Sequence, residues 1–141
     1  LEWRAGNGVT RVDTLLDVAH NTHAANFLVQ AIQARYPTYR IFAVVGMLED
    51  KDIAGTLTTL APAVDAWYFA SLSVARGSSA EQLADHVAAE VAEKVPVRGC
   101  FASVLEAYQQ AQQDALATTG QPILVLVCGS FYTVGQIPDS E

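Results

Sequence analysis

The chain has 141 residues, a length typical of one domain, and 51% of them are hydrophobic, which is enough to build a core. Acidic residues outnumber basic residues by 15 to 8, the formal net charge is −7, and the basic residues are scattered along the chain. This charge pattern argues against nucleic-acid binding, and no apolar run approaches the roughly 20 residues that a membrane-spanning helix needs.

After Leu1 no basic segment followed by an apolar stretch is visible, so the sequence gives no indication of a secretory signal peptide. Because the chain begins with Leu1 and its only methionine is Met47, we expect a fragment or one domain of a longer protein. The cysteines, Cys100 and Cys128, form no spaced motif and are interpreted as reduced thiols of a cytoplasmic protein. Cys128 ends an apolar run and is expected to be buried.

The first segments predict a β-hairpin followed by a helix. Leu1 to Arg4 and Val9 to Leu16 are strand-like, and Asn7-Gly8 between them tolerates the positive φ of a tight turn. Helical spacing runs from Thr22 to Tyr36, and Pro37 ends it. The face of this helix expected to be buried consists of Ala25, Leu28, Ile32 and Tyr36.

Strand-like and helix-like segments alternate over the rest of the chain. Continuous apolar runs, typical of strands buried on both faces, are Ile41 to Val45, Ala66 to Ala70 and Ile123 to Val127, and Val95 to Val97 is a shorter candidate. Helices are expected from Asp52 to Leu60, from the capping box at Ser79 to about Lys94, from Ser103 to Leu116, and briefly after Ser130.

This order predicts an α/β fold of the Rossmann-like type, with a doubly wound, mostly parallel sheet, helices on both faces and the N-terminal hairpin. Ligands in such sheets bind beyond the carboxyl ends of the strands. The segments at those ends are Asp17 to His23, Gly46 to Asp52, Ser71 to Ser79 and Cys128 to Thr133.

Asp17, His20 and Asn21 form a polar cluster between a strand and a helix. A carboxylate in that place can accept hydrogen bonds from ribose hydroxyls or orient the water of a metal ion. The spacing is equally consistent with Asp17 and Asn21 as helix caps and His20 as a loop histidine. His20 and His23 could share a helix face, but no third ligand is near, so we assign no metal site.

Lys51 and Ser130 follow two of the other predicted core strands. An ammonium group at a strand end can bind a carboxylate or phosphate as a point charge, and a Gly-Ser turn with free amides can hold a carboxylate. A solvated charged turn and a plain helix cap remain alternative interpretations of the two residues.

Several nucleotide and hydrolase motifs are missing from the sequence. It contains no P-loop, no G-x-G-x-x-G after the first strand and no G-x-S-x-G nucleophile elbow. A nucleotide-related function must therefore depend on a partner domain.

Several motifs, in order, nevertheless resemble one family. Asp17 to Ala25 (D-V-A-H-N-T-H-A-A) closely resembles the D-x-A-H-N-P-x-A signature of folylpolyglutamate synthases and Mur ligases. Gly46 to Leu57 is similar to the G-M-L-x-D-K-D-I-A-G-T-L segment of bacterial bifunctional dihydrofolate synthase/folylpolyglutamate synthases, and Val127 to Val134 continues the match. The likeness covers about Leu15 to Val134.

The resemblance implies that residues 1–141 are the C-terminal, glutamate-ligase domain of an ATP-dependent ligase of folate biosynthesis. In that family ATP phosphorylates a carboxylate of dihydropteroate or a folate, and the amine of L-glutamate attacks the acyl phosphate. The P-loop and the Mg ligands belong to an N-terminal domain, which would precede Leu1. The isolated domain is therefore expected to be inactive.

The resemblance also implies roles for individual residues. Asp17, His20 and Asn21 would contact ATP, and Lys51 and Ser130 would hold the incoming glutamate, while no catalytic or metal-binding residue is assigned. Tyr132 stands where the family commonly has a histidine, so it receives no role. The rival hypothesis is a non-catalytic Rossmann-like module that binds a small anion or a protein partner.

Overall fold

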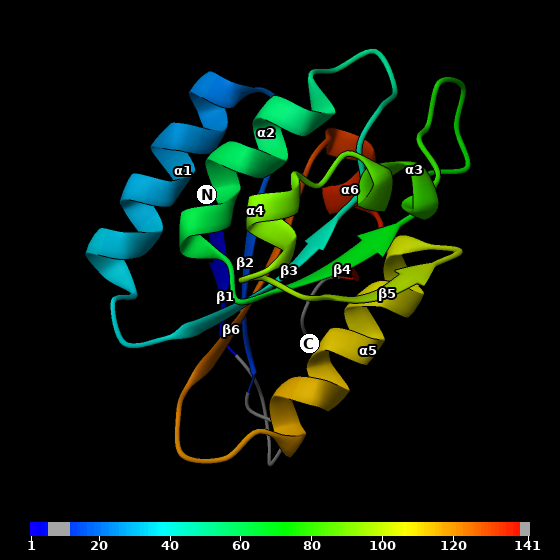
Figure 1. Ribbon diagram of the computed structural model, residues 1–141. Helices are drawn as coiled ribbons and strands as arrows, with labels where there is room; N and C mark the ends of the chain where they lie inside the picture. The colour runs from blue at the N-terminus through cyan, green and yellow to red at the C-terminus, as the bar shows by residue number, and fades with distance from the viewer. Residues whose placement is uncertain (6–11, 139–141) are drawn as a thin grey trace.

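The computed structural model describes residues 1–5 and 12–138 and contains one six-stranded sheet with helices on both of its faces (Figure 1). The strands are β1 (Glu2–Arg4), β2 (Asp13–Asp17), β3 (Arg40–Val45), β4 (Ala66–Ala70), β5 (Val97–Phe101) and β6 (Ile123–Cys128). The helices are α1 (Thr22–Arg35), α2 (Ile53–Leu60), the 3-10 helix η1 (Ala61–Ala63), α3 (Ala80–Asp85), α4 (Ala89–Ala92), α5 (Val104–Ala117) and α6 (Phe131–Gly135).

The strand order is β1-β2-β6-β3-β4-β5, with β1 antiparallel to β2 and every other pair parallel. This confirms the predicted α/β fold, the mostly parallel sheet and the N-terminal strand pair. β6, the last strand in sequence, inserts between β2 and β3, so the connection through α1 must pass over it. The order in which the chain adds strands to the sheet therefore reverses at β6, and folds of this kind bind ligands at such a reversal.

Alternate residues of each strand enter two separate hydrophobic clusters. One cluster joins side chains such as Leu15, Ala43 and Leu126 to α1, α2 and α3, and the other joins Leu16, Val44 and Val125 to α5. Figure 1 shows α1 and α2 on one side of the sheet and α5 on the other. Because β3, β4 and β6 are covered on both faces, they need the continuous apolar runs that the sequence contains.

The long helices follow the predicted boundaries. In α1 the residues Ala25, Leu28 and Ile32 are buried as expected, while Tyr36 is only partly buried and caps the C-terminus. The inward face of α5 consists of Val104, Ala107, Ala111 and Ala115. Its small alanine side chains let the helix pack closely on the sheet.

The helix expected from Ser79 to Lys94 is wrong in its extent, because it divides into α3 and α4. In an uninterrupted helix the carbonyl of Gln82 would accept the backbone N–H of His86. Here Nδ1 of the His86 ring hydrogen-bonds the Gln82 carbonyl oxygen at 2.7 Å. The His86 backbone N–H donates instead to the carbonyl oxygen of Leu83 at 3.1 Å. The side chain thus competes with the backbone and ends α3.

The strand expected at Val95 to Val97 instead begins at Val97 and continues to Phe101. Val95 still belongs to the α4 turn, since its N–H donates to Val91, and the Pro96 carbonyl accepts from Trp67. β5 lies at the edge of the sheet with mostly exposed or half-exposed side chains, so it lacks the apolar run that identifies a central strand.

The antiparallel pair at the N-terminus places Arg4 opposite Thr14. The predicted Asn7-Gly8 turn and the Val9 end of the predicted strand lie outside the described residues, and the strand as described begins at Asp13. Among the residues that are described, no helix combines the length and apolarity needed to cross a membrane.

Candidate functional site

The carboxyl ends of the central strands lie at one edge of the sheet. Asp17 of β2 pairs with Cys128 of β6, and Cys128 pairs in turn with Val45 of β3. The three segments that follow these strands therefore leave the sheet at the same level and next to one another. Residues that are far apart in sequence are brought together by this register.

A cavity of about 220 Å³ opens at this edge. It is lined by His20, Leu48, Lys51, Ser130, Phe131 and Tyr132. The cavity therefore collects His20, Lys51 and Ser130, which the sequence places on three different strand ends. A larger groove near the C-terminal end of α1, lined by residues such as Tyr36 and Asp65, lies away from all the predicted site residues.

The β2–α1 segment is held by its own polar side chains. Asp17 Oδ1 accepts the N–H of Ala19 at 2.8 Å, and the Leu1 nitrogen lies 3.3 Å from Oδ2. Asn21 Oδ1 accepts the N–H of Ala24 at 2.8 Å and so caps α1. Asp17 and Asn21 thus both make local hydrogen bonds to the backbone, as expected if they act as helix caps. Neither residue lines the cavity.

His20 reaches the cavity from the same segment. Its Nδ1 lies 2.9 Å from the carbonyl oxygen of Val18. A carbonyl can only accept, so this contact places the proton on Nδ1 and leaves Nε2 of the neutral ring as an acceptor. The ring is therefore oriented by the backbone, with one nitrogen still able to bind a partner.

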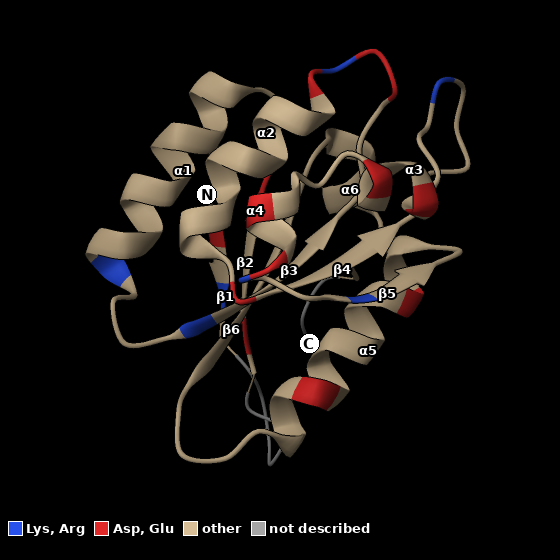
Figure 2. Ribbon diagram, viewed as in Figure 1, with Lys and Arg blue, Asp and Glu red and all other residues tan. Residues whose placement is uncertain are grey.

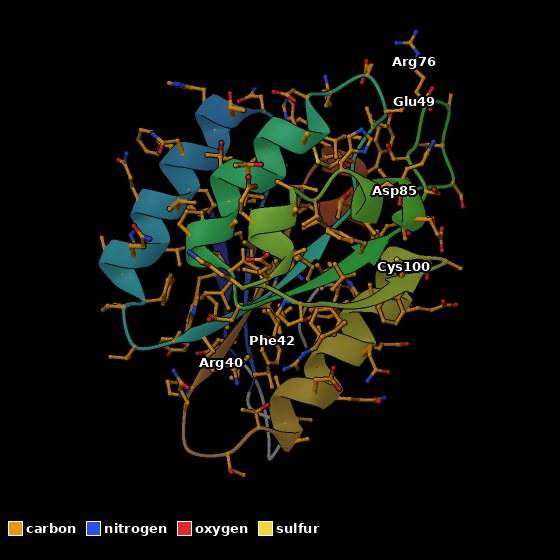
Figure 3. All side chains as sticks on the ribbon, viewed as in Figure 1. Arg40, Phe42, Glu49, Arg76, Asp85 and Cys100 are labelled. Carbon is orange, nitrogen blue, oxygen red and sulfur yellow. The ribbon has the colours of Figure 1, made fainter. Side chains whose placement is uncertain are left out.

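Lys51 lies in the segment between β3 and α2, which a second loop holds in place. Residues 71–79 pack on this segment, where Arg76 O accepts from Glu49 N at 2.7 Å and Met47 O accepts from Ser78 N at 2.9 Å. Figure 3 shows Arg76 and Glu49 beside each other. The segment Ser71 to Ser79, one of the predicted candidate segments, therefore supports the Lys51 loop and brings no side chain into this cavity.

The two acidic residues directly beside Lys51, Asp50 and Asp52, interact with other groups. Figure 2 shows acidic and basic residues interleaved between β3 and α2. Asp50 pairs with Arg76 at 3.5 Å, and Asp52 Oδ1 caps α2 by accepting the N–H of Gly55. Lys51 makes no ion pair within the described part of the chain. Its ammonium group is therefore available for an anion.

Ser130 lies at the start of α6 and is 5% exposed. Its Oγ accepts the N–H of Thr133 at 3.0 Å, which makes it the helix cap. Cys128, two residues earlier, is fully buried as predicted, whereas Cys100 is exposed. Burial and the nearby Asp17 carboxylate raise the pKa of the Cys128 thiol to about 12, so it stays protonated at neutral pH and is no nucleophile.

Three further residues line the cavity, Leu48, Phe131 and Tyr132, which lie in the predicted strand-end segments but were assigned no role from the sequence. Phe131 is 74% exposed and Tyr132 is 51% exposed, which is unusual for aromatic side chains. Their sequence signal was their position, directly after Ser130 for Phe131 and Tyr132 and three residues before Lys51 for Leu48. In residues 1–5 and 12–138, no cluster of three or more His, Cys, Asp or Glu side chains is arranged to hold a metal ion.

Known proteins show the same sequence pattern. Residues 1–131 match the family described as "Mur ligase, glutamate ligase domain". The dihydrofolate synthase/folylpolyglutamate synthase of Escherichia coli strain K12 is 45% identical over 123 residues, which cover 87% of this chain and 26% of that protein. The chain thus spans about a quarter of the length of this relative.

Solved structures show the same fold. A bifunctional folylpolyglutamate synthase/dihydrofolate synthase with Mn, AMPPNP and L-glutamate bound superposes with a TM-score of 0.73 at 43% identity, covering 93% of this chain and 29% of that one. The Mycobacterium tuberculosis folylpolyglutamate synthase complexed with ADP and AMPPCP gives 0.74 at 25% identity, covering 87% and 28%. With the match over residues 1–131, these likenesses show that the chain belongs to the glutamate ligase domain family of the Mur ligases.

Proposed function

We propose that this chain is the C-terminal domain of an ATP-dependent ligase that adds L-glutamate to dihydropteroate, to folates or to both. The observation that carries the proposal is the cavity in which Lys51, Ser130 and His20 meet at the carboxyl edge of the sheet. The names of the relatives and the L-glutamate bound in a similar structure support this substrate. The P-loop domain and the Mg ligands would belong to the part of the ligase that precedes Leu1.

In this proposal Lys51 and Ser130 hold the incoming glutamate. The ammonium group of Lys51 has no acidic partner among the described residues, so it can bind a carboxylate without breaking an existing ion pair. Glutamate must be positioned so that its amine reaches the carbonyl carbon of the acyl phosphate. Positioning of the two reactants supplies much of the catalytic effect in such a reaction.

Asp17, His20 and Asn21 form the proposed nucleotide side of the site. His20 lines the cavity with Nε2 as an acceptor, and Asp17 lies three residues before it, at the end of β2. Asn21 fixes the segment by capping α1. ATP and Mg would be held mainly by the N-terminal domain, and this domain would close over the nucleotide from the other side.

We place the reaction in the cytoplasm. Cys100 and Cys128 are both free thiols, and unpaired cysteines are typical of a reducing compartment.

The test is steady-state kinetics of the complete ligase with Lys51→Ala. Loss of a hydrogen bond to a charged group typically costs about 1.5–3 kcal/mol, so we expect the glutamate KM to rise by at least about ten-fold. The ATP KM should change by less than about two-fold, because Lys51 is assigned to glutamate alone. Lys94→Ala is the matched control: it removes the other lysine, which is exposed beside α4, and should leave both constants unchanged.

Two outcomes would contradict the proposal. An unchanged glutamate KM in Lys51→Ala would remove Lys51 from the site. Failure of the complete protein to form product from ATP, L-glutamate and a pteroate or folate would refute the ligase itself and favour the non-catalytic module. The chain of residues 1–141 alone should show no ATP-dependent ligation.

A further inference from the structure

A buried hydroxyl group joins the two loops that carry Lys51 and Ser130. Thr133 of α6 is fully buried, and its Oγ1 donates to the carbonyl oxygen of Gly46 at 2.7 Å. Gly46 follows β3 directly and begins the segment that leads to Lys51. The bond therefore connects the end of β3 to the start of α6.

The same hydroxyl group determines how the proton of Ser130 is oriented. Ser130 Oγ lies 2.8 Å from Thr133 Oγ1, and either atom could donate on distance alone. A carbonyl oxygen can only accept, so Thr133 Oγ1 must donate its proton to the carbonyl oxygen of Gly46. Ser130 must then donate to Thr133, while it accepts the N–H of Thr133 at 3.0 Å. Its hydroxyl is held in one orientation, in which Oγ has no proton left for a carboxylate but keeps one lone pair that can accept a hydrogen bond from the amine of glutamate.

The surrounding backbone leaves little room for another arrangement. Gly46 N donates to Cys128 O at 3.3 Å, so the β3 and β6 ends are already in contact. A Cβ built on Gly129 would lie 2.1 Å from Gly46 O, and one built on Gly46 would lie 2.9 Å from Thr133 Oγ1. The two loops thus meet through glycine backbone and the one hydroxyl group.

We propose that Thr133 is a positioning residue for glutamate in the ligase reaction, an inference that rests on the function proposed above. Thr133 does not line the cavity, but it acts through Ser130 and through the segment of Lys51, both of which do. Without its hydroxyl, the buried Gly46 carbonyl loses its donor and the Ser130 proton is free to rotate. Both proposed glutamate ligands then lose their fixed placement relative to each other.

The experiment compares Thr133→Val, which keeps the side-chain shape and removes the hydroxyl, with Thr133→Ser, which keeps the hydroxyl, in the complete ligase. We expect Thr133→Val to raise the glutamate KM by about ten-fold, the upper end of what one hydrogen bond contributes, with the ATP KM within about two-fold. Thr133→Ser should restore the glutamate KM to within about three-fold of the wild-type value.

Thr14→Val is the matched control. Thr14 is also a buried threonine, 2% exposed, and its Oγ1 hydrogen-bonds Tyr108 at 2.8 Å, but it lies on β2 before the carboxyl edge. This variant should lose a comparable amount of thermal stability while keeping both KM values. The comparison therefore separates a general packing defect from loss of positioning.

The outcomes distinguish this inference from the proposed function. If Lys51→Ala raises the glutamate KM but Thr133→Val does not, the role of Thr133 is overturned and the ligase proposal stands. Equal increases in both KM values, or failure of Thr133→Ser to rescue, would also overturn it, because either would indicate a packing effect. If Lys51→Ala itself has no effect, the glutamate site is wrong and the inference falls with it.

Discussion

Gly129 lies between β6 and Ser130 with a φ of +120°, a backbone conformation that residues other than glycine rarely adopt. A Cβ at this position would also meet the Gly46 carbonyl oxygen. The residue is thus required both for its conformation and for the close approach of two loops. From the sequence, the Gly-Ser turn could be identified as a candidate anion site, but Gly46 could not be identified as the residue it contacts.

Gly129→Ala should therefore lower the free energy of unfolding by about 2 kcal/mol or more, since backbone strain alone typically costs about 1–3 kcal/mol. Chemical unfolding followed by circular dichroism measures this change. Gly120→Ala is the control for strain without a clash, because Gly120 also has a positive φ, +85°, but nothing lies within 4 Å of its Cβ position. Equal losses in the two variants would show that the contact with Gly46 costs nothing.

Single residues also show what kind of signal a site leaves in a sequence. His20, Lys51 and Ser130 were predicted because charged or polar side chains at strand ends are recognisable locally and because the motifs resembled a family. Thr133 was not, since its partner Gly46 is 87 positions away and a buried threonine has no distinctive sequence pattern.

Among the elements, helix starts were predicted better than helix ends. The capping box of α3 is present, with Ser79 Oγ accepting from Gln82 N at 3.1 Å and Gln82 Oε1 accepting from Ser79 N at 2.8 Å. Asp52 and Ser103 cap α2 and α5 as their positions indicated. These signals are local. The end of α3 depends instead on the hydrogen bond between the His86 ring and the Gln82 carbonyl oxygen, and no glycine or proline in the sequence marks that position.

Ser79→Ala should lower the free energy of unfolding by about 1 kcal/mol, because it removes the side-chain acceptor for the Gln82 amide. Ser79→Asp restores an acceptor and places a negative charge at the helix start, so it should recover most of the loss. Urea unfolding of the three proteins tests this. A Ser79→Ala protein as stable as wild type would mean that the box contributes nothing to α3.

For the whole molecule, both buried layers contain a group that must stay protonated. Burial raises the pKa of Cys128 to about 12, and burial together with a hydrogen bond to Asp114 raises the pKa of Tyr68 above its ordinary value. Tyr68 donates to Asp114 at 2.6 Å and accepts from Arg98 at 3.2 Å, under α5. The folded chain therefore holds both protons more tightly than the unfolded chain does.

We accordingly expect the free energy of unfolding to fall in alkaline solution. The unfolded thiol and phenol release their protons as the pH passes their ordinary values of 9.0 and 10.0, while the folded groups remain protonated. The stabilisation is thus complete below pH 9 and decreases steadily as the pH rises towards 12. Urea unfolding at a series of pH values measures the slope.

The matched variants are Cys128→Ala and Tyr68→Phe, each of which should flatten the decrease by about 1.4 kcal/mol per pH unit over its own range. In Tyr68→Phe the Asp114 carboxylate keeps Gln110 as a donor at 2.9 Å, so the variant leaves no isolated charge. A slope unchanged in both variants would show that other groups cause the alkaline loss.

By itself, the sequence determined the elements and the chemical groups at their ends. Continuous apolar runs, capping residues and strand-end polar residues are local features, so β3, β4, β6, α1, α2 and α5 could be predicted within a residue or so. Only the tertiary structure decided the strand order. Any two parallel strands can form the same backbone hydrogen bonds, so the position of β6 between β2 and β3 depends on long-range packing of both sheet faces. That position is what brings His20, Lys51 and Ser130 to one cavity.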